Sequence, residues 1–355
     1  MIAGHHALGH HLPALAARIP WVPLGEWPTP IRPVKIAGET IWVKDEGASS
    51  PLYGGNKIRC LEMWFGHARE RGARKIWAIG AYGSNHAIAT ALHAPRAGLE
   101  AAAIVFPQPT SEWAVENCAA LLATGCEIVR VANIALMPLV ALRIARRERD
   151  AVMMSPGGAT PIGTPGAVSG VFELADQIAA GELPPPRRIV VGVGSACTIA
   201  GLVAGLTLAH AVGVWRWPVP RVHGVRVTPW PVTAPLRVAD LAARTLARFE
   251  RLGGPRVAIG RRELLARFVI DGREIGAGYG RPTERGAHAM ERFEGPRLDG
   301  VYSAKAAAGL LRLHAAGIGP LVFWASKSHV MLPQPTLEEL RDRPPRIMRW
   351  LRSQV

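Results

Sequence analysis

Tyr53-Gly54-Gly55-Asn56-Lys57 places an amine on a glycine-rich turn directly before a predicted helix. The positive end of a helix dipole and the free N–H groups of the first turn favour a neutral, nucleophilic amine and attract anions. Such a lysine suits a Schiff base with a phosphorylated aldehyde. The chain has only six lysines, and Lys57 has the best local context. Glycine pairs also mark ordinary surface turns, so these five residues alone leave both interpretations open.

Strand and helix patterns alternate on both sides of this turn. Residues 39–44 predict a strand before it, and apolar residues at helical spacing predict a helix over 57–68 after it. Further strands are predicted at 75–79, 101–106, 127–131, 188–193 and 320–324, and further helices at 87–97, 111–125, 168–180, 198–210, 238–252, 283–293 and 304–315. This alternation predicts parallel sheets with right-handed crossovers. The proline-rich range 218–235 has no clear pattern.

Composition excludes several classes of protein. The chain has 355 residues, of which 49% are hydrophobic, and its apolar runs are far shorter than the roughly 20 residues of a membrane span. The net charge of +15 invites nucleic-acid binding, but the arginines are scattered along predicted helices without a dense basic tail. The four cysteines lack the paired spacing of a metal site, and no secretory segment is evident. We therefore expect a cytoplasmic α/β protein that binds neither nucleic acid, membrane nor metal.

A second turn has the properties of a phosphate site. Gly194-Ser195-Ala196-Cys197-Thr198 follows the apolar strand 188–193 and begins a helix. Consecutive N–H groups and the helix dipole can hold a dianion there, and two hydroxyls add donors. The turn lacks a P-loop lysine and the spacing of a dinucleotide site. Many strand-to-helix turns use glycine and serine only to turn, so this motif is weak by itself.

Taken together, these turns resemble a family of pyridoxal-phosphate (PLP) enzymes, the 1-aminocyclopropane-1-carboxylate deaminase and D-cysteine desulfhydrase family. The family's segments occur here in the same order, as Pro28-Thr29-Pro30, Lys44-Asp45-Glu46, Gly54-Gly55-Asn56-Lys57-Ile58-Arg59, Ser84-Asn85-His86 and Gly194 to Leu202. Gly278-Tyr279-Gly280 and Val301-Tyr302 with Lys305 match further landmarks. The resemblance covers nearly the whole chain.

The resemblance implies the tryptophan synthase β-like fold (fold type II), in which two open, twisted, mostly parallel sheets are flanked by helices. It implies a large cofactor-binding domain of residues 1–58 and 165–355 and a small substrate-closing domain of residues 59–164. The glycine-rich range 157–166 independently predicts a boundary. PLP is the implied cofactor, a small amino acid the implied substrate, and a homodimer the implied assembly.

Roles for individual residues follow from the same resemblance. The implied cofactor-binding residues are Lys57, Asn56, Gly194, Ser195, Ala196, Cys197, Thr198 and Ser326. The implied catalytic residues are Lys57, Ser84, Tyr279 and Tyr302, and those implied to bind substrate are Ser84, Asn85 and His86. Lys57 would bind the cofactor and then act as acid and base at the α-carbon of the substrate. A structural or supporting role is favoured for His86.

Two departures from the family pattern concern turns. Gly83 stands where the family has glutamine, so a side chain is missing beside the expected substrate carboxylate. Ala196 and Cys197 replace two glycines of the phosphate turn, which is tolerable if neither residue needs a positive φ. We expect no reactive role for Cys197.

Three further departures concern the expected position of the pyridine nitrogen and the neighbouring wall of the site. Ser303 stands where the deaminases place a glutamate, which disfavours action on the cyclopropane substrate. Ser326 matches a threonine and is the preferred partner of that nitrogen. Lys327 replaces a glycine, and it either serves an acidic substrate group or is an ordinary surface lysine at the end of a strand.

These observations predict a PLP-dependent lyase or deaminase that eliminates a β-substituent from a small amino acid such as D-cysteine, releasing keto acid and ammonia. A PLP-dependent β- or γ-replacement enzyme of a biosynthetic pathway is the alternative within the fold. A basic binding protein that kept the fold without the cofactor is the alternative from another class.

Overall fold

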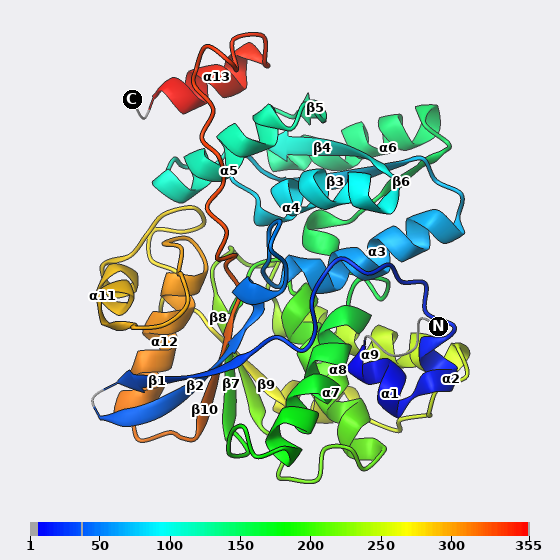
Figure 1. Cartoon of the computed structure of the whole chain (residues 1–355), viewed down its shortest axis with the longest axis vertical. Coiled ribbons are helices and arrows are strands. Elements are labelled where there is room, and N and C mark those ends of the chain that lie inside the picture. The colour runs from blue at the N-terminus through cyan, green and yellow to red at the C-terminus, as the bar shows by residue number, and fades with distance from the viewer. Residues whose placement is uncertain (1–5, 37, 354–355) are drawn as a thin grey trace.

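The computed structural model describes residues 6–36 and 38–353, which form two β-sheets covered by helices (Figure 1). The order is β1-β2-β10-β7-β8-β9 in the larger sheet and β5-β4-β3-β6 in the smaller one. β1 runs antiparallel to β2, and every other neighbouring pair is parallel. The predicted fold class of two mostly parallel sheets flanked by helices is confirmed.

The strands are short, as is usual in parallel sheets with helical crossovers. The larger sheet contains β1 (Ile31–Ile36), β2 (Glu39–Asp45), β7 (Arg188–Val193), β8 (Arg221–Arg226), β9 (Phe268–Asp271) and β10 (Leu321–Ala325). The smaller sheet contains β3 (Lys75–Ala81), β4 (Glu100–Phe106), β5 (Glu127–Arg130) and β6 (Ala151–Met153). Strands such as Ile189-Val190-Val191 are fully buried because helices cover both faces of the sheet.

Helices connect nearly all of these strands. They are α1 (Ala7–His11), α2 (Pro13–Ala16), α3 (Lys57–Glu70), α4 (Asn85–His93), α5 (Glu112–Ala123), α6 (Met137–Arg147), α7 (Pro165–Ala179), α8 (Cys197–Ala211), α9 (Pro235–Arg251), α10 (Arg261–Ala266), α11 (Glu284–Arg292), α12 (Ser303–Ala315) and α13 (Pro345–Arg352). Short 3-10 turns lie at Glu46–Ala48, Ala94–Ala97, Ile134–Leu136 and Pro156–Gly158. Among the described helices, none is long and apolar enough to cross a membrane.

Strand β8 lies in the range that had no clear pattern in the sequence. Its residues Arg-Val-His-Gly-Val-Arg do not form an apolar run, although the four central ones are buried. Gly224 is needed in this strand because a Cβ there would overlap side chains of Ile199 on α8 and Val193 on β7. The close packing of α8 against β8 therefore requires a glycine at position 224. This requirement is visible only in the folded chain.

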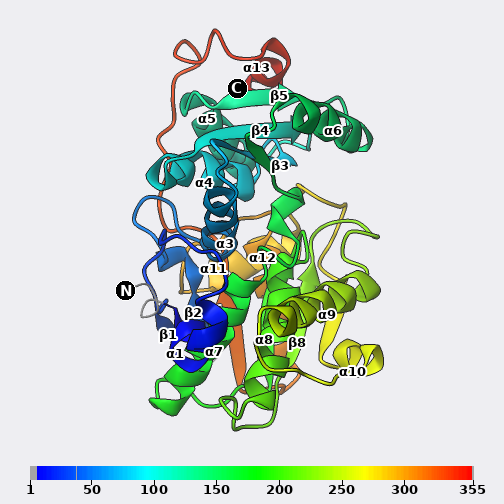
Figure 2. The same ribbon diagram turned by 90° about the vertical axis from the view of Figure 1, so that its right-hand side faces the viewer.

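The two sheets define two units of the chain, seen one above the other in Figure 1 and Figure 2. All four strands of the smaller sheet come from residues within 59–164, and the larger sheet is built from the chain on either side. Helix α13 returns to the smaller unit, where it contacts α5 and buries Ile347, Met348 and Leu351 in the same core. The chain thus crosses between the units three times.

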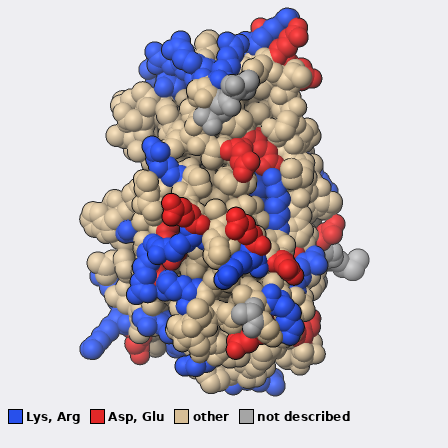
Figure 3. Space-filling view, turned by 90° about the vertical axis from the view of Figure 1, so that its left-hand side faces the viewer, with Lys and Arg blue, Asp and Glu red and all other residues tan. Residues whose placement is uncertain are grey.

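Charged side chains cover much of the surface. On the face shown in Figure 3, lysines and arginines lie beside acidic side chains over the lower part of the molecule and at its top. Exposed ion pairs of the protein include those of Arg74 with Glu100 and with Asp150. Exposed pairs of this kind contribute little to stability.

Candidate active site

The Lys57 turn is fixed against the segment that follows β10. The Gly54 N–H donates to Ser328 Oγ at 2.9 Å, and the Asn56 N–H donates to the Ser326 carbonyl at 3.4 Å. Gly55 has a φ of +103°, a conformation that suits glycine. Helix α3 begins at Lys57 itself, and its N-cap residue Asn56 gives it no side-chain cap. Lys57 therefore stands at the positive end of a helix, as the sequence predicted.

A buried ion network lies beneath this turn and joins three of the motifs found in the sequence. Arg59, two residues after Lys57, pairs with Glu46 at 2.6 Å and with Glu173 on α7 at 2.9 Å. Lys44 also pairs with Glu173, and it donates to the Thr29 carbonyl at 2.7 Å. Burial alone would raise the pKa of Glu173, but the charges of Arg59 and Lys44 hold it at about 2. The network anchors the first turn of α3 and with it Lys57.

The predicted phosphate turn lies next to Lys57. Ser195 Oγ donates to the Gly157 carbonyl at 3.4 Å, and Thr198 Oγ1 accepts from Asn56 Nδ2 at 3.0 Å. Helix α8 begins at Cys197 without a side-chain cap. A Cβ built on Gly157 would lie 3.7 Å from Lys57 Nζ and would overlap Ser195. Gly157 thus keeps open the space between the lysine and the turn.

The condition under which alanine would be tolerated at position 196, that the residue needs no positive φ, is not met. Ala196 is the N-cap residue of α8 and has a φ of +73°, the left-handed conformation that favours glycine. It is the only residue other than glycine with a positive φ in the described part of the chain. The turn therefore keeps the geometry of a glycine turn with an alanine in it, which costs about 1 kcal/mol.

Cys197 is buried at the start of α8, with its Sγ 3.5 Å from the Gly158 carbonyl. The neighbouring Cys60 sulfur and burial together raise the pKa of the Cys197 thiol. Cys197 therefore remains a protonated thiol beneath the turn. Cys60 and its position here were not foreseen from the sequence, because the two cysteines are far apart in the chain.

Ser84, Asn85 and His86 form the N-terminus of α4, after β3. Ser84 Oγ accepts from the Ala87 N–H at 3.2 Å and so caps the helix. Asn85 Oδ1 accepts from Tyr53 OH at 2.8 Å and from Asn117 Nδ2 at 2.9 Å. His86 is buried, and its two ring nitrogens have no hydrogen-bond partner among the described residues. The Ser84 N–H donates to the Ala81 carbonyl at 3.0 Å, whereas the N–H groups of Asn85 and His86, in the first turn of α4, have no acceptor among the described residues.

The structure explains why Gly83 has no side chain. A Cβ at this position would overlap the backbone of Ala114 on α5. The Gly83 N–H instead donates to Gln108 Oε1 at 3.3 Å, and Asn117 Nδ2 donates to the Gly83 carbonyl at 3.0 Å. Gln108 and Asn117 thus place side-chain amides beside Gly83, where the family pattern has glutamine. Neither residue was identified from the sequence.

Tyr279 and Tyr302 come together, as their assignment to one site requires. Their hydroxyl oxygens lie 2.6 Å apart. Burial raises the pKa of both phenols, to about 12 for Tyr279. The Tyr302 ring lies against Gly194, where an added Cβ would be 3.1 Å from the ring. This contact places the tyrosine pair directly beside the phosphate turn.

Lys305 and Asp299 hold the two tyrosines in place. Lys305 Nζ donates to the carbonyls of Ile275 at 2.9 Å and Gly278 at 3.0 Å, so it fixes the backbone before Tyr279. Burial lowers the pKa of Lys305 to about 8. Asp299 accepts from the Tyr302 N–H at 2.7 Å. Both supports depend on contacts that the sequence does not show.

Ser303 and Ser326 differ in their surroundings. Ser303 is buried, and its hydroxyl donates to Asp299 Oδ2 at 2.9 Å. The hydrogen-bonding capacity of this hydroxyl is therefore used within the protein. The Ser326 side chain is partly exposed at the end of β10, and its hydroxyl has no partner among the described residues. Ser326 is therefore the hydroxyl left available for a ligand.

These groups meet at the carboxyl ends of parallel strands, the usual ligand site of such sheets. The loops after β2, β7 and β10 bring Lys57, Gly194 to Thr198 and Ser326 together, and the loop after β6 brings Gly157. The donor set fits PLP: an amine, an uncapped helix start for the phosphate, an amide and a free hydroxyl. The open space at Gly157 lies between the first two of these.

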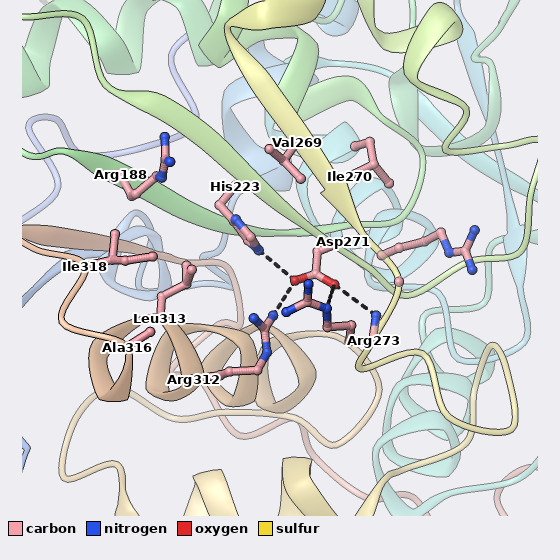
Figure 4. Close-up of a pocket in the computed structure, with 12 residues that line it drawn as sticks. Arg188, His223, Val269, Ile270, Asp271, Arg273, Arg312, Leu313, Ala316 and Ile318 are labelled. Atoms are coloured by element: carbon pink, nitrogen blue, oxygen red, sulfur yellow. Dashed lines mark hydrogen bonds and ion pairs between the residues drawn. The ribbon is translucent and has the colours of Figure 1, made fainter.

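A larger hollow lies elsewhere, along β8, β9 and α12, and none of the predicted site residues lines it (Figure 4). Its polar groups are largely paired with one another. Asp271 accepts from His223 at 2.9 Å and also pairs with Arg312. A single group of possible metal ligands occurs among the described residues, His10, His11 and Asp176, and His11 is already bonded to Asp176 at 2.7 Å.

The fold and site define a PLP enzyme, and comparisons with known proteins agree. Residues 22–320 match the family described as pyridoxal-phosphate dependent enzyme. Nocardicin C-9' epimerase of Nocardia uniformis is 32% identical over 87% of this chain and 93% of its own. D-Cysteine desulfhydrase of Yersinia pestis is 31% identical over 77% of this chain and 81% of its own. A crystal structure of an ACC deaminase homologue has a TM-score of 0.73 at 28% identity, covering 93% of this chain and 98% of its own.

The chain belongs to the family of pyridoxal-phosphate dependent enzymes. Both the cofactor and the fold type predicted from the sequence are thereby confirmed. The relatives include a D-cysteine desulfhydrase and a deaminase homologue, the kind of enzyme that the sequence predicted.

Proposed function

We propose that the protein is a PLP-dependent lyase that removes the α-proton of a small amino acid and expels its β-substituent, giving keto acid and ammonia. D-Cysteine, or a related sulfur amino acid, is the preferred substrate. The observation that carries the proposal is the meeting of Lys57 with the turn Gly194 to Thr198 across the space kept open by Gly157. The relative named D-cysteine desulfhydrase supports the reaction type.

The bound cofactor would draw electrons from the α-carbon of the amino acid. Lys57, at the positive end of α3, would move the proton at that carbon. The backbone N–H groups of Asn85 and His86, together with the Ser84 hydroxyl, would hold the α-carboxylate at the start of α4. Ser326 would face the ring nitrogen of the cofactor as a neutral partner, and Asn56 the phenolic oxygen. The N–H groups and hydroxyls from Gly194 to Thr198 would hold the phosphate.

The tyrosine pair would act on the substrate side of the site. The two hydroxyls are hydrogen-bonded at 2.6 Å, and both phenols stay protonated at neutral pH because burial raises their pKa. A phenol held in this way can orient the β-substituent or protonate it as it leaves. Lys305 and Asp299 would keep the pair in position.

The test is a panel of D- and L-amino acids added to the purified, PLP-loaded protein. We expect the visible absorbance of the cofactor to shift, and sulfide and ammonia to appear with cysteine. Lys57→Ala should lose the lysine-bound absorbance and turnover, whereas the matched variant at an exposed lysine, Lys35→Ala, should keep both. A Lys57→Ala protein that retains absorbance and turnover would overturn the assignment.

Epimerisation is a second candidate, favoured by the similarity to nocardicin C-9' epimerase. It begins with the same removal of the α-proton and ends with its return on the other face. Running the panel in deuterated water separates the two outcomes: an epimerase incorporates deuterium into a recovered amino acid of inverted configuration, and a lyase yields keto acid. Replacement of the β-substituent gains no support from the relatives compared.

We also propose a homodimer in a reducing compartment such as the cytoplasm. Free cysteines agree with that setting. Apolar side chains lie exposed along one segment of the smaller unit, Ile134, Leu136, Leu139 and Leu142, as is typical of surfaces that pair. Light scattering should report a dimer, and Leu139→Glu should weaken it. A monomer at micromolar concentration would contradict the proposal.

The two units would have different roles, one in binding the cofactor and the other in closing over the substrate. Residues 1–58 and 165–355 would bind the cofactor, and residues 59–164 would close over the substrate, with α13 moving alongside them because it packs on α5. A change in small-angle scattering on addition of substrate would test this closure.

A further inference from the structure

Lys327 differs from the other deeply buried cations of the chain. It is 2% exposed, and its ammonium has no hydrogen-bond partner among the described residues. Lys44 and Arg59 are paired with carboxylates, and Lys305 donates to two carbonyls. A buried ammonium that has only a long ion pair and no hydrogen-bond partner is costly, and proteins rarely keep one without a use.

The acidic groups around Lys327 are engaged elsewhere. Its nearest carboxylate is Glu116, at 3.9 Å, and the same oxygen pairs with Arg297 at 2.8 Å. Asp299 accepts from the N–H groups of Val301 and Tyr302 and from the Ser303 hydroxyl. The Tyr53 ring lies 5.9 Å from the ammonium and gives only partial compensation.

The Lys327 side chain lines a small pocket beside the proposed reaction site. The pocket lies between the start of α4, α5 and the segment before α12, and its lining includes Asn85, Gln108, Asn117, Tyr302 and Lys327. Asn85 and Tyr302 belong to both the pocket and the predicted site. A substrate held at the start of α4 would therefore have part of its structure in reach of Lys327.

The chemistry of the pocket indicates an anionic ligand group. Burial lowers the pKa of Lys327, and a bound anion would reverse this by pairing with the ammonium. The N–H groups of α4 already suit one carboxylate, the α-carboxylate of an amino acid. The side-chain amide of Gln108, of which only the oxygen is hydrogen-bonded among the described residues, adds a neutral donor that can complete the hydrogen bonds of a second carboxylate.

We propose that Lys327 binds a carboxylate on the side chain of the amino-acid substrate, so that the enzyme prefers acidic amino acids over uncharged ones of the same shape. This inference rests on the proposed function, because it needs an amino acid in the site. It narrows the substrate of the proposed lyase from D-cysteine and related sulfur amino acids to one whose β-substituent carries a carboxylate.

The test is a titration of the PLP-loaded enzyme with D- and L-aspartate and glutamate, and with asparagine and glutamine as uncharged isosteres. Binding is read from the shift of cofactor absorbance and, independently, by calorimetry. We expect the acidic amino acids to bind about tenfold more tightly than their isosteres. Lys327→Met should remove this preference while keeping the affinity for the uncharged amino acids, and Lys327→Arg should retain part of it.

Lys35→Met is the matched control, because Lys35 is exposed on β1, and it should bind all four amino acids like the unchanged enzyme. Equal or tighter binding of asparagine and glutamine by the unchanged enzyme would overturn the role of Lys327 and leave the lyase proposal standing. So would a Lys327→Met protein with an unchanged preference. If no amino acid of either panel perturbs the cofactor, both proposals fall.

Discussion

Tyr279 and Tyr302 share one short hydrogen bond, 2.6 Å between their hydroxyl oxygens, from segments that lie on either side of α11. Their rings meet edge to face, with centroids 5.9 Å apart. Each hydroxyl is therefore positioned by the other, and the two should act as one unit.

Removing either hydroxyl should impair the reaction, and removing both should cost little more. We expect Tyr279→Phe and Tyr302→Phe each to lower kcat/KM by about tenfold to a hundredfold, with a strongly non-additive double variant. Steady-state kinetics of the four proteins gives the coupling. Tyr82→Phe, which removes a hydroxyl bonded to Arg130, serves as the control and should leave kcat/KM unchanged. Additive losses would show that the tyrosines act independently.

Ala196→Gly should stabilise the protein. The left-handed φ of +73° strains an alanine but not a glycine, and its release is expected to add about 1 kcal/mol to the free energy of unfolding. Chemical denaturation of the cofactor-free protein measures it. Ala200→Gly, within the same helix, should instead destabilise by about 1 kcal/mol. Equal losses from both substitutions would mean that Ala196 is unstrained.

Gly83→Ala should destabilise the smaller unit, since its methyl group would overlap the backbone of Ala114. We expect a loss of about 1 to 3 kcal/mol, typical of overpacking, and a higher KM because α4 follows directly. Thermal denaturation and kinetics measure the two effects. Gly319→Ala is the control, as no heavy atom lies within 4 Å of the added Cβ. An equally small effect at both positions would contradict crowding at Gly83.

The Glu173 network predicts acid sensitivity. The pKa of Glu173 is about 2 in the folded protein, against an ordinary 4.5. The unfolded chain therefore binds more protons as the pH falls, so stability present above pH 4.5 is lost progressively down to about pH 2. Glu173→Gln should lower stability at pH 7 by about 3 kcal/mol, because Lys44 and Arg59 lose a shared partner. In the Glu173→Gln variant, stability should also fall less steeply as the pH decreases below 4.5.

Denaturation midpoints measured from pH 7 to pH 3 give this dependence. The exposed Glu291→Gln should follow the unchanged protein. If Glu173→Gln lost stability in acid as steeply as the unchanged protein, another carboxylate would be responsible for the loss of stability at low pH.

The sequence was most informative where structure depends on neighbours in the chain. The turn before Lys57, the start of α8 and the apolar strand 188–193 are local features, so turn residues and apolar runs reveal them. Motif order then indicated that distant turns share one site. It could not indicate that Lys44, Arg59 and Thr29 meet Glu173, because that network depends on how α7 packs beneath α3.

Burial was harder to foresee than position. Lys327 follows a strand, where a lysine is usually solvated, yet the segment before α12 and helix α5 enclose it. Ala196 reads as an ordinary small residue until its φ is known. Gln108 and Asn117 belong to no motif, and only the packing of α5 against Gly83 brings them to the site.

The three crossings of the chain between its two units all pass through the site. Lys57 stands at the first, Gly157 at the second, and Ser326 with Lys327 at the third. Three covalent tethers allow a twist or a slight tilt, but they oppose a wide swing about one hinge. The first and third tethers carry groups proposed to touch cofactor or substrate, and the second carries Gly157, which keeps open the space beside Lys57. Any shift of the smaller sheet would therefore move those groups. Binding of the substrate and movement of the two units relative to each other would then be coupled directly.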